Sequence, residues 1–246
     1  MSPSLFQVLN ISSQDMNARL DDLANSGNSL SNINTTGYKS SRMYFQELLN
    51  EANRSGVKLS SSQLLMTQGK LRPTENPTDV AINGNGFFSV RLPNGDIGYT
   101  RDGSFILDEN KQLLNTDGYK IIIQGAIPAD AEEISIDQVG TITARVNDVW
   151  SEAGTIQLTR FTNPGGLTNI GNNILIESIN SGKPQTGNAG STDFGVLVPS
   201  TLENSNVNFA DEITHLIVVQ RSFQLASRAF QTTSEMIDGA IRLRKV

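Results

Sequence analysis

Residues of the kinds that usually carry chemistry are scarce in this sequence. The chain has 246 residues, with one histidine and no cysteine. A zinc site built from cysteine and histidine ligands is therefore excluded. The histidine, His215, lies inside a segment with helical periodicity, where a lone histidine is more often a surface or packing residue than a catalyst. These residues predict that the protein is not an enzyme.

Two further patterns are similar to binding loops, and each lacks an essential part. The stretch GNGFF, residues 84–88, begins like a phosphate-binding glycine loop, but the third glycine is missing and no helical pattern follows. Gly84 and Gly86 are therefore expected to serve backbone geometry at the start of a strand. Asp102 and Asp108 lie near a turn, whereas a calcium loop needs a denser run of acidic residues. We therefore predict no cofactor and no metal.

Composition narrows the classes of partner. The net charge is −6, only 18% of residues are charged, and no lysine or arginine run occurs, which argues against a nucleic-acid or anionic-membrane surface. The first residues, MSPSLFQVLN, lack the basic start and long apolar run of a classical secretory signal. No stretch of about 18 apolar residues is present to span a membrane. If the chain leaves the cytoplasm, we expect export by another route.

Residues 4–30 have the periodicity of an amphipathic helix. Leu9, Met16, Leu23 and Leu30 recur every seven residues. A seven-residue apolar repeat forms a narrow stripe that packs best against a partner helix, as in a coiled coil. An ordinary amphipathic surface helix is the alternative reading of the same pattern.

The C-terminal segment predicts a second, longer helix of about 30 residues, which would span roughly 45 Å. Acidic residues at its start and basic residues at its end suit the helix dipole. Two apolar lines follow the seven-residue repeat. The first line consists of Leu216, Phe223, Phe230 and Ile237, and the second consists of Val219, Ala226 and Ala240, with Thr233 as its polar member.

Between the two ends the periodicity becomes that of β-strands. Phe88, Val90 and Leu92 alternate with polar residues and are followed by an Asn-Gly turn, which predicts a hairpin. Similar alternation, interrupted by glycine, asparagine and aspartate, continues to about residue 198. The stretch MYFQELLNEA, residues 43–52, is expected to form a short helical turn.

We therefore predict an α+β fold. Its N- and C-terminal helices pair as a coiled coil, with an inserted mainly-β domain and an extended connector. The predicted parts are an N-terminal helix at 1–36, the connector at 37–76, the β-rich domain at 77–198 and the long C-terminal helix at 199–246.

Four sequence motifs, in this order along the chain, carry a resemblance to a known family. They are NSLSNINTTGYKSSR (28–42), DVAINGNGFFSV (79–90), YTRDGSF (99–105) and LENSNVNFADEITHLIVVQRSFQLASRAF (202–230). Together they resemble the bacterial flagellar axial proteins of the rod and hook. The motif residues that we single out are Asn32, Asn34, Thr35, Gly37, Tyr38, Lys39, Arg101, Asp102, Gly103, Phe105, Asn206, Gln220 and Arg221.

The resemblance implies a structural subunit of the flagellar basal-body rod, most like the distal rod protein. In this family the terminal helices pair as coiled coils, and the subunits stack helically into a torque-transmitting tube. The T-T-G-Y-K segment is where the helix ends and the chain turns outward, and Tyr38 and Lys39 are expected to anchor that exit against a neighbour. The expected assembly interface consists of Leu9, Met16, Leu23, Leu30, Leu216, Phe223, Phe230 and Ile237.

The resemblance also implies partners and a location. The partners are further copies of the chain, other rod subunits, the hook protein, the flagellar export apparatus and the surrounding ring proteins. The chain would be exported by the type III route without a cleaved signal peptide. It would lie in the basal body, outside the cytoplasmic membrane, with terminal helices that become ordered on assembly.

Some features depart from the family pattern. Ser26 and Gly27 stand where the family usually has helix formers, so we expect the helix to break or bend there. The region between Tyr44 and Asp79 is shorter than in many distal-rod proteins. A proximal-rod or short hook-type subunit is therefore the alternative within the family. A stalked extracellular adhesin is the alternative outside it.

Overall fold

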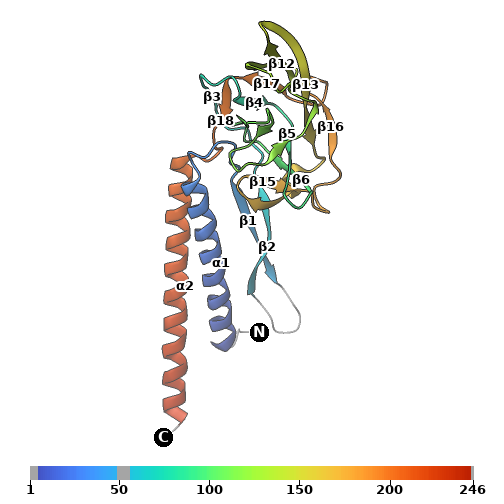
Figure 1. Cartoon of the computed structure of the whole chain (residues 1–246). Coiled ribbons are helices and arrows are strands. Elements are labelled where there is room, and N and C mark those ends of the chain that lie inside the picture. The colour runs from blue at the N-terminus through green and yellow to red at the C-terminus, as the bar shows by residue number, and fades with distance from the viewer. Residues whose placement is uncertain (1–4, 49–55, 245–246) are drawn as a thin grey trace. The chain divides into compact units, whose positions relative to one another are not determined.

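The computed structural model describes residues 5–48 and 56–244 (Figure 1). The chain divides into two compact units. Unit 1 contains Met1–Ser31, Ser41–Gln63 and Val207–Val246, and unit 2 contains Asn32–Ser40 and Leu64–Asn206. Helices are found near both ends of the chain and strands between them, so the predicted α+β class is confirmed.

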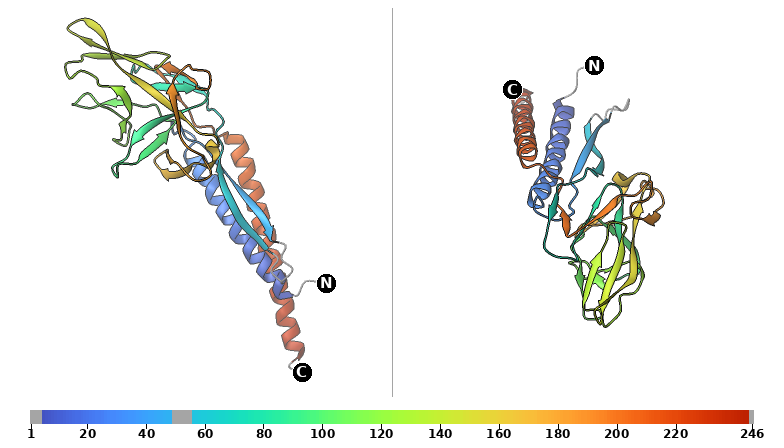
Figure 2. Two further views of the ribbon diagram at one scale, coloured as in Figure 1. Left: turned by 90° about the vertical axis from the view of Figure 1, so that its right-hand side faces the viewer. Right: turned by 90° about the horizontal axis from the view of Figure 1, so that it is seen from above.

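Unit 1 contains two long helices and a two-stranded sheet. The helices are α1 (Leu5–Ser31) and α2 (Phe209–Arg244), and α2 is longer than the sequence predicted, with 36 residues. They lie side by side and run in opposite directions (Figures 1 and 2). The sheet pairs β1 (Ser41–Leu48) with β2 (Gly56–Leu64), and β1 also contacts α1.

The break expected near Gly27 is absent, because α1 continues to Ser31. A glycine inside a helix costs about 1 kcal/mol, which tertiary packing can offset. The side-chain amide of Asn25 donates to the Ser41 carbonyl oxygen over 2.8 Å and ties this turn of the helix to β1. Ser26 and Ser29 are almost fully buried. Small side chains on this face therefore fit a close contact that larger helix formers would obstruct.

Two expectations about the region after α1 need correction or refinement. The helical turn predicted at 43–52 is wrong for residues 43–48, which belong to β1, and residues 49–52 lie outside the described part of the chain. Segment 37–76, expected as an extended connector, contributes the β1–β2 pair and strand β3 (Leu71–Pro73). The polar residues of β2 alternate too weakly for periodicity to reveal a strand.

Unit 2 consists of short strands and one 3₁₀ turn, η1 (Pro164–Gly166). After β3 its strands are β4 (Val80–Asn83), β5 (Phe87–Arg91), β6 (Ile97–Thr100), β7 (Ile106–Leu107), β8 (Leu113–Leu114), β9 (Lys120–Ile121), β10 (Ile123–Gly125), β11 (Glu133–Ile136), β12 (Thr141–Val146), β13 (Val149–Arg160), β14 (Thr168–Gly171), β15 (Ile174–Ile176), β16 (Gln185–Asn188), β17 (Val196–Pro199) and β18 (Thr201–Glu203).

The main sheet of unit 2 is antiparallel and joins twelve strands. Its path runs β11-β12-β13-β5-β6-β15-β14, with β10 and β16 also paired to β13. The hairpin predicted at 88–100 is confirmed as β5–β6, with Phe88 opposite Thr100 and Arg91 opposite Ile97. Two smaller pairs, β4 with β17 and β3 with β18, join the start of unit 2 to its end.

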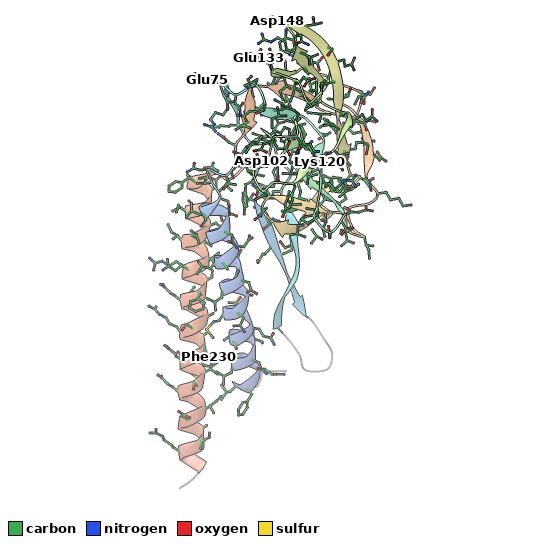
Figure 3. All side chains as sticks on the ribbon, viewed as in Figure 1. Glu75, Asp102, Lys120, Glu133, Asp148 and Phe230 are labelled. Atoms are coloured by element: carbon green, nitrogen blue, oxygen red, sulfur yellow. The ribbon has the colours of Figure 1, made fainter. Side chains whose placement is uncertain are left out.

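The core of unit 2 lies between these strands, where the side chains gather in Figure 3. Phe88 and Phe105 are fully buried and pack edge to face, with ring centroids 4.9 Å apart. A second cluster contains Tyr99 and Phe161, with ring centroids 4.8 Å apart. Such contacts hold the motif segment 99–105 rigidly in the unit.

Candidate functional site

The chain turns sharply after α1 and then docks on the β structure of unit 2. The Thr35 backbone N–H donates to the Asn32 carbonyl oxygen over 3.1 Å. Gly37 has φ +68°, a left-handed conformation that favours glycine. A Cβ added to Gly37 would lie 2.5 Å from the Asp102 backbone nitrogen. The T-T-G-Y-K and Y-T-R-D-G-S-F segments therefore meet backbone to backbone.

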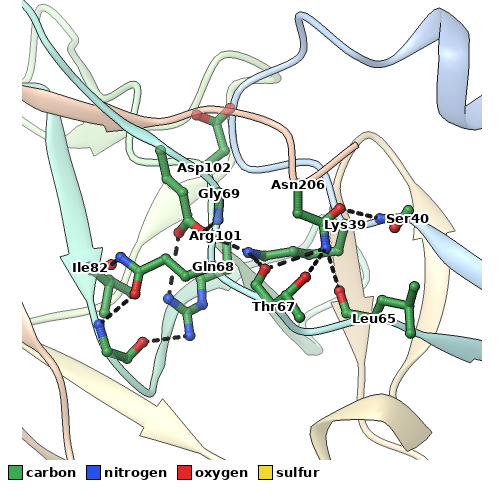
Figure 4. A network of polar contacts seen from close by, with 12 residues as sticks. Lys39, Ser40, Leu65, Thr67, Gln68, Gly69, Ile82, Arg101, Asp102 and Asn206 are labelled. Carbon is green, nitrogen blue, oxygen red and sulfur yellow. Dashed lines mark hydrogen bonds and ion pairs between the residues drawn. The ribbon is translucent and has the colours of Figure 1, made fainter. Parts of the chain in front are cut away.

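A buried polar cluster forms around Glu203, and we call Glu203, Lys39, Arg101 and Asn206 the Glu203 node. Figure 4 shows Lys39, Arg101 and Asn206 within this network of polar contacts. Glu203 has no exposed surface. Its Oε1 accepts hydrogen bonds from Lys39 Nζ over 2.6 Å and from the Gly69 backbone N–H over 2.9 Å. Its Oε2 lies 3.5 Å from Nη1 of Arg101. The single carboxylate of Glu203 therefore partly neutralises the positive charges of two buried side chains, Lys39 and Arg101.

The two cations of the node are held by neutral groups as well. Lys39 Nζ donates to the Thr67 carbonyl oxygen over 2.8 Å. Arg101 Nη2 donates to the Gly84 carbonyl oxygen over 2.9 Å, and the guanidinium lies 5.2 Å from the centroid of the Phe87 ring. Burial lowers the pKa of both Lys39 and Arg101, and the attraction of Glu203 offsets this only in part.

Asn206 completes the node with uncharged contacts. Its Oδ1 accepts from the Ser40 backbone N–H over 2.8 Å. Its Nδ2 donates to the Leu65 carbonyl oxygen over 2.7 Å and to Thr67 Oγ1 over 3.0 Å. The node and its partners therefore join five segments, at 39–40, 65–69, 84, 101 and 203–206. Lys39 and Arg101 also line a hollow of only about 10 Å³, and Nε of Arg101 has no hydrogen-bond partner among the described residues. The other polar groups of the node bind one another or the backbone, so the arrangement suits a structural junction.

Other motif residues of unit 2 lie in or beside the core. Gly103 is buried, and Phe105 is 1% exposed. Asp102 Oδ1 accepts from the backbone N–H and the hydroxyl of Ser104, over 3.0 and 2.6 Å. This is the turn that the sequence predicted at Asp102. Tyr38 is 9% exposed within unit 2, so its ring is buried in its own chain.

The residues proposed for the helix stripes are less deeply buried. Leu9, Met16 and Leu30 on α1 are partly buried, and Leu23 is 38% exposed. Residues Leu216, Phe223, Phe230 and Ile237 on α2 are likewise partly buried, and Gln220 and Arg221 are exposed.

The deepest positions of the helices belong to other residues. On α2 they are Val219, Ala226 and Thr233, the second heptad line of the sequence. On α1 they are mostly small or polar residues, namely Ser12, Ala18, Asp22, Ser26 and Ser29. Oδ1 of Asp22 on α1 lies 3.2 Å from Nε2 of His215 on α2. The single histidine of the chain is therefore within hydrogen-bond distance of a carboxylate on the neighbouring helix.

Comparison with known proteins identifies the family. Residues 81–144 match the flagellar hook protein FlgE/F/G D1 domain, and residues 198–243 match the C-terminal region of flagellar basal-body rod FlgEFG proteins. The chain is 34% identical to the flagellar basal-body rod protein FlgG of Borreliella burgdorferi, over 98% of this chain and 100% of the relative. The chain belongs to the flagellar basal-body rod and hook family.

Two further rod proteins agree with this assignment. FlgG of Buchnera aphidicola from Acyrthosiphon pisum is 35% identical over 96% of this chain and 98% of its own length. FlgG of Agrobacterium fabrum is 34% identical over 94% and 96%. The family is structural, which confirms that the protein is not an enzyme. The relatives named as basal-body rod proteins imply a location in the flagellar basal body. The stalked-adhesin alternative receives no support.

Glu203 is the important residue that the sequence motifs of this rod protein did not single out. It stands two residues before the S-N-V-N motif, inside the motif segment 202–230. A glutamate in a strand of otherwise buried residues is a signal for a buried ion pair, but its partner Lys39 lies 164 residues away. Lys39, expected to anchor against a neighbour, is instead bound inside its own chain.

The described residues contain neither a membrane-spanning helix nor a metal-binding cluster. Within residues 5–48 and 56–244, no helix combines the length and apolar character that crossing a membrane requires. In the same part of the chain, no group of three or more His, Asp or Glu side chains is arranged to hold a metal ion.

Replacing Asp102 with asparagine should stabilise unit 2 of the rod protein at neutral pH. Burial raises the pKa of Asp102 above 3.8, and the hydrogen bonds from Ser104 counteract this only in part. The folded state therefore binds the Asp102 proton more tightly than the unfolded state does. The stability that this proton contributes is present below pH 3.8 and is lost as pH rises through the raised pKa of the folded state. Asparagine keeps the acceptor oxygen without the charge.

Urea unfolding followed by Trp150 fluorescence tests this expectation. Asp102→Asn should unfold at higher urea than the wild type at pH 7, and the difference should shrink below pH 3.8. Asp130→Asn, at an exposed position, is the matched control and should change neither value. A lower midpoint for Asp102→Asn at pH 7 would show that the charged carboxylate is needed in the turn.

Proposed function

We propose that the chain is a distal-rod-type subunit that polymerises helically, through its terminal helices, into a torque-transmitting tube. The observation that carries this proposal is a second apolar face on α2. Val218, Leu225 and Met236 are 57%, 66% and 58% exposed. They are separated by seven and eleven residues, which places them on one side of an α-helix. A helix with apolar residues on two faces needs partners beyond one neighbouring helix.

Pairing of α1 and α2 as a coiled coil is part of the proposal. The buried line of Val219, Ala226 and Thr233 faces a helix whose deepest residues are small, which favours close approach of the two backbones. Leu23 of α1 and the outer residues of α2 then contact copies of the chain. In such a polymer each subunit uses two different surfaces, so that the contacts continue indefinitely.

We infer contacts with other rod subunits and the hook protein, and with the export apparatus and ring proteins on the way to the final position. The chain would span the periplasm after export without a cleaved signal peptide. Because the family models cover FlgE, FlgF and FlgG proteins, a proximal-rod or short hook-type position is the second candidate.

Amide hydrogen exchange on the purified monomer and on isolated basal bodies tests the proposal. Residues 1–35 and 205–246 should exchange much more slowly in the assembly than in the monomer, whereas residues 77–198 should be protected in both. Ordering on assembly places the entropic cost of folding the ends at the polymerisation step. Ends that are fully protected in a monomer absent from basal bodies would refute the polymerising-rod proposal.

Replacing Phe223 with aspartate should abolish incorporation into the rod. Phe223 lies on the α2 face that also carries Val219 and Ala226, and a charge introduced into a packed seam is costly. Immunodetection of the subunit in purified basal bodies should fall at least tenfold, and the urea midpoint of unit 2 should not change. Gln224→Asp, one position along at an exposed site, is the control and should assemble normally. Normal incorporation of Phe223→Asp would disprove the seam.

A further inference from the structure

The β12–β13 hairpin ends in an exposed apolar tip. Asn147 and Asp148 have φ of 51° and 60°, the two-residue turn that matches the twist of a hairpin. The next two residues, Val149 and Trp150, are 66% and 49% exposed. Trp150 is the only tryptophan in the chain. Tryptophan is enriched at the centres of protein interfaces, so an exposed one at a projecting tip is a candidate anchor.

Acidic groups surround the apolar residues of the tip. Asp148 lies at its apex, and Glu152 is exposed further along β13. Arg145, opposite Trp150 in the hairpin, is engaged by two carboxylates, Glu132 at 3.7 Å and Glu133 at 3.4 Å. The tip therefore presents an indole ring with a local excess of negative charge.

Elsewhere in unit 2, a cavity of about 390 Å³ has the complementary character. Its charged lining residues are three cations, Arg91, Lys111 and Lys120, and no acidic residue lines it. No ion pair of these three cations is found among the described residues. Its accessible apolar lining consists of Ile122, Ile123 and Ala126, and the buried residues Leu113, Ile121 and Ile127 lie beneath them. The volume lies within the range of pockets that bind a compact ligand.

This concentration of positive charge runs against the charge of the unit as a whole. Ten lysines and arginines against sixteen aspartates and glutamates give unit 2 a net charge of −6. A cavity with cations and no acid in such a unit is therefore a local exception. It is complementary to the acidic surface that a further copy of the same chain would present.

The tip and the cavity lie in different parts of unit 2. Figure 3 shows Asp148 at the end of the hairpin and Lys120 well away from it, nearer the middle of the unit. Gly125 of β10, at the rim of the cavity, pairs with Gly154 of β13, and the strand then continues away from the cavity toward Val149. A chain cannot place its own tip in its own cavity without unfolding β13.

We propose that the β12–β13 tip of one copy inserts into the basic cavity of the next copy. Trp150 and Val149 contact the apolar lining, and Asp148 faces Lys111 and Lys120. Because the tip and the cavity are different surfaces of one molecule, this contact is head-to-tail, and it builds an open helical array when its rotation does not close into a ring. The inference rests on the proposed rod function and specifies a contact between neighbouring β units within that polymer.

Disulfide cross-linking tests this contact directly, because the chain has no cysteine of its own. A full-length chain with Asp148→Cys and Lys120→Cys, purified within basal bodies and oxidised, should form a ladder of dimers, trimers and larger species. Co-assembly of chains with one cysteine each should stop at dimers. The control pair Glu75→Cys with Lys120→Cys, which uses an exposed glutamate outside the tip, should yield at least tenfold less product.

Charge reversal provides an independent measurement that does not require a disulfide. Lys120→Glu and Asp148→Lys should each lower incorporation into basal bodies about tenfold, because like charges would then face each other. The chain that carries both substitutions should regain part of the lost incorporation, since positions 148 and 120 again carry opposite charges while Lys111 remains positive. A role of either residue in folding alone gives no such rescue.

The outcomes separate this inference from the proposed function. If the wild-type chain is absent from purified basal bodies, the rod proposal and the inference both fail. If the cysteine variants are incorporated but no ladder forms, or if the double charge reversal gives no rescue, the rod proposal stands and the tip-in-cavity contact is overturned. Cross-linking of Lys120→Cys to a protein of a different mass would also overturn it, because the proposed occupant is a second copy.

Discussion

Replacing Glu203 with glutamine is expected to destabilise unit 2 by about 3 to 5 kcal/mol. Glutamine has nearly the same shape, but it leaves Lys39 and Arg101 as buried cations without a counter-charge. Removal of one partner from a buried ion pair is costly because the remaining charge has lost both water and its neutralising group. Urea unfolding, followed by the fluorescence of Trp150 within unit 2, measures the loss.

Two control variants define what the Glu203→Gln result means. Glu75→Gln changes an exposed glutamate of the same unit and should alter stability by no more than about 0.5 kcal/mol. Adding Lys39→Met to Glu203→Gln removes one of the two buried cations that lack a counter-charge. The double variant should therefore recover part of the lost free energy of unfolding. If Glu203→Gln is as stable as Glu75→Gln, or if the second substitution simply adds to the damage, the node does not stabilise the fold.

The same variant should show a characteristic pH dependence. Burial already lowers the pKa of Lys39 below 10.5, and Glu203 supplies the interactions that oppose this shift. Without Glu203, the folded state releases the lysine proton more readily than the unfolded state does. The stability deficit of Glu203→Gln relative to wild type is therefore present below the folded-state pKa and should shrink as pH rises toward 10.5.

Local sequence patterns predict the helices and the clearest strands of this protein. The seven-residue repeat ending at Ile237 and the alternation around Val90 need only nearby residues to specify a helix or a hairpin. Gly37 is similar, because a glycine after an Asn/Thr-rich helix end indicates a left-handed turn. These elements form largely where they are predicted, although the helix predicted at 199–246 begins only at Phe209, because residues 201–203 form β18.

Contacts between distant segments could not be predicted in the same way. The carboxylate of Glu203 reaches Lys39 across 164 residues, and no spacing in the sequence encodes that pairing. The buried face of α1 is another case, because Ser26 and Ser29 look like solvent-facing residues until a neighbour covers them. The strand at 43–48 resembled a helical turn because its pairing with β2, rather than its own composition, determines its conformation.

Replacing Gly103 with alanine should be among the most damaging single substitutions in unit 2. A Cβ at this position would overlap the carbonyl oxygen of Val80 and lie 2.8 Å from the Val80 carbonyl carbon. The Val80 backbone N–H also donates to the Gly103 carbonyl oxygen over 3.1 Å, so β4 and the segment at Gly103 cannot separate without losing this bond. We expect a loss of about 3 kcal/mol or more, since the obstacle is backbone rather than a flexible side chain.

A comparison with Gly95→Ala separates crowding from backbone conformation. Gly95 has φ +89° and open space around it, so alanine there should cost only about 1 to 2 kcal/mol of conformational strain. Gly103 does not have a positive φ, so its cost arises from the lack of space. Urea midpoints from Trp150 fluorescence should therefore fall much further for Gly103→Ala than for Gly95→Ala. Equal effects would mean that the approach of Gly103 to Val80 is looser than the structure shows, and that the Y-T-R-D-G-S-F segment owes its glycine to something other than this contact.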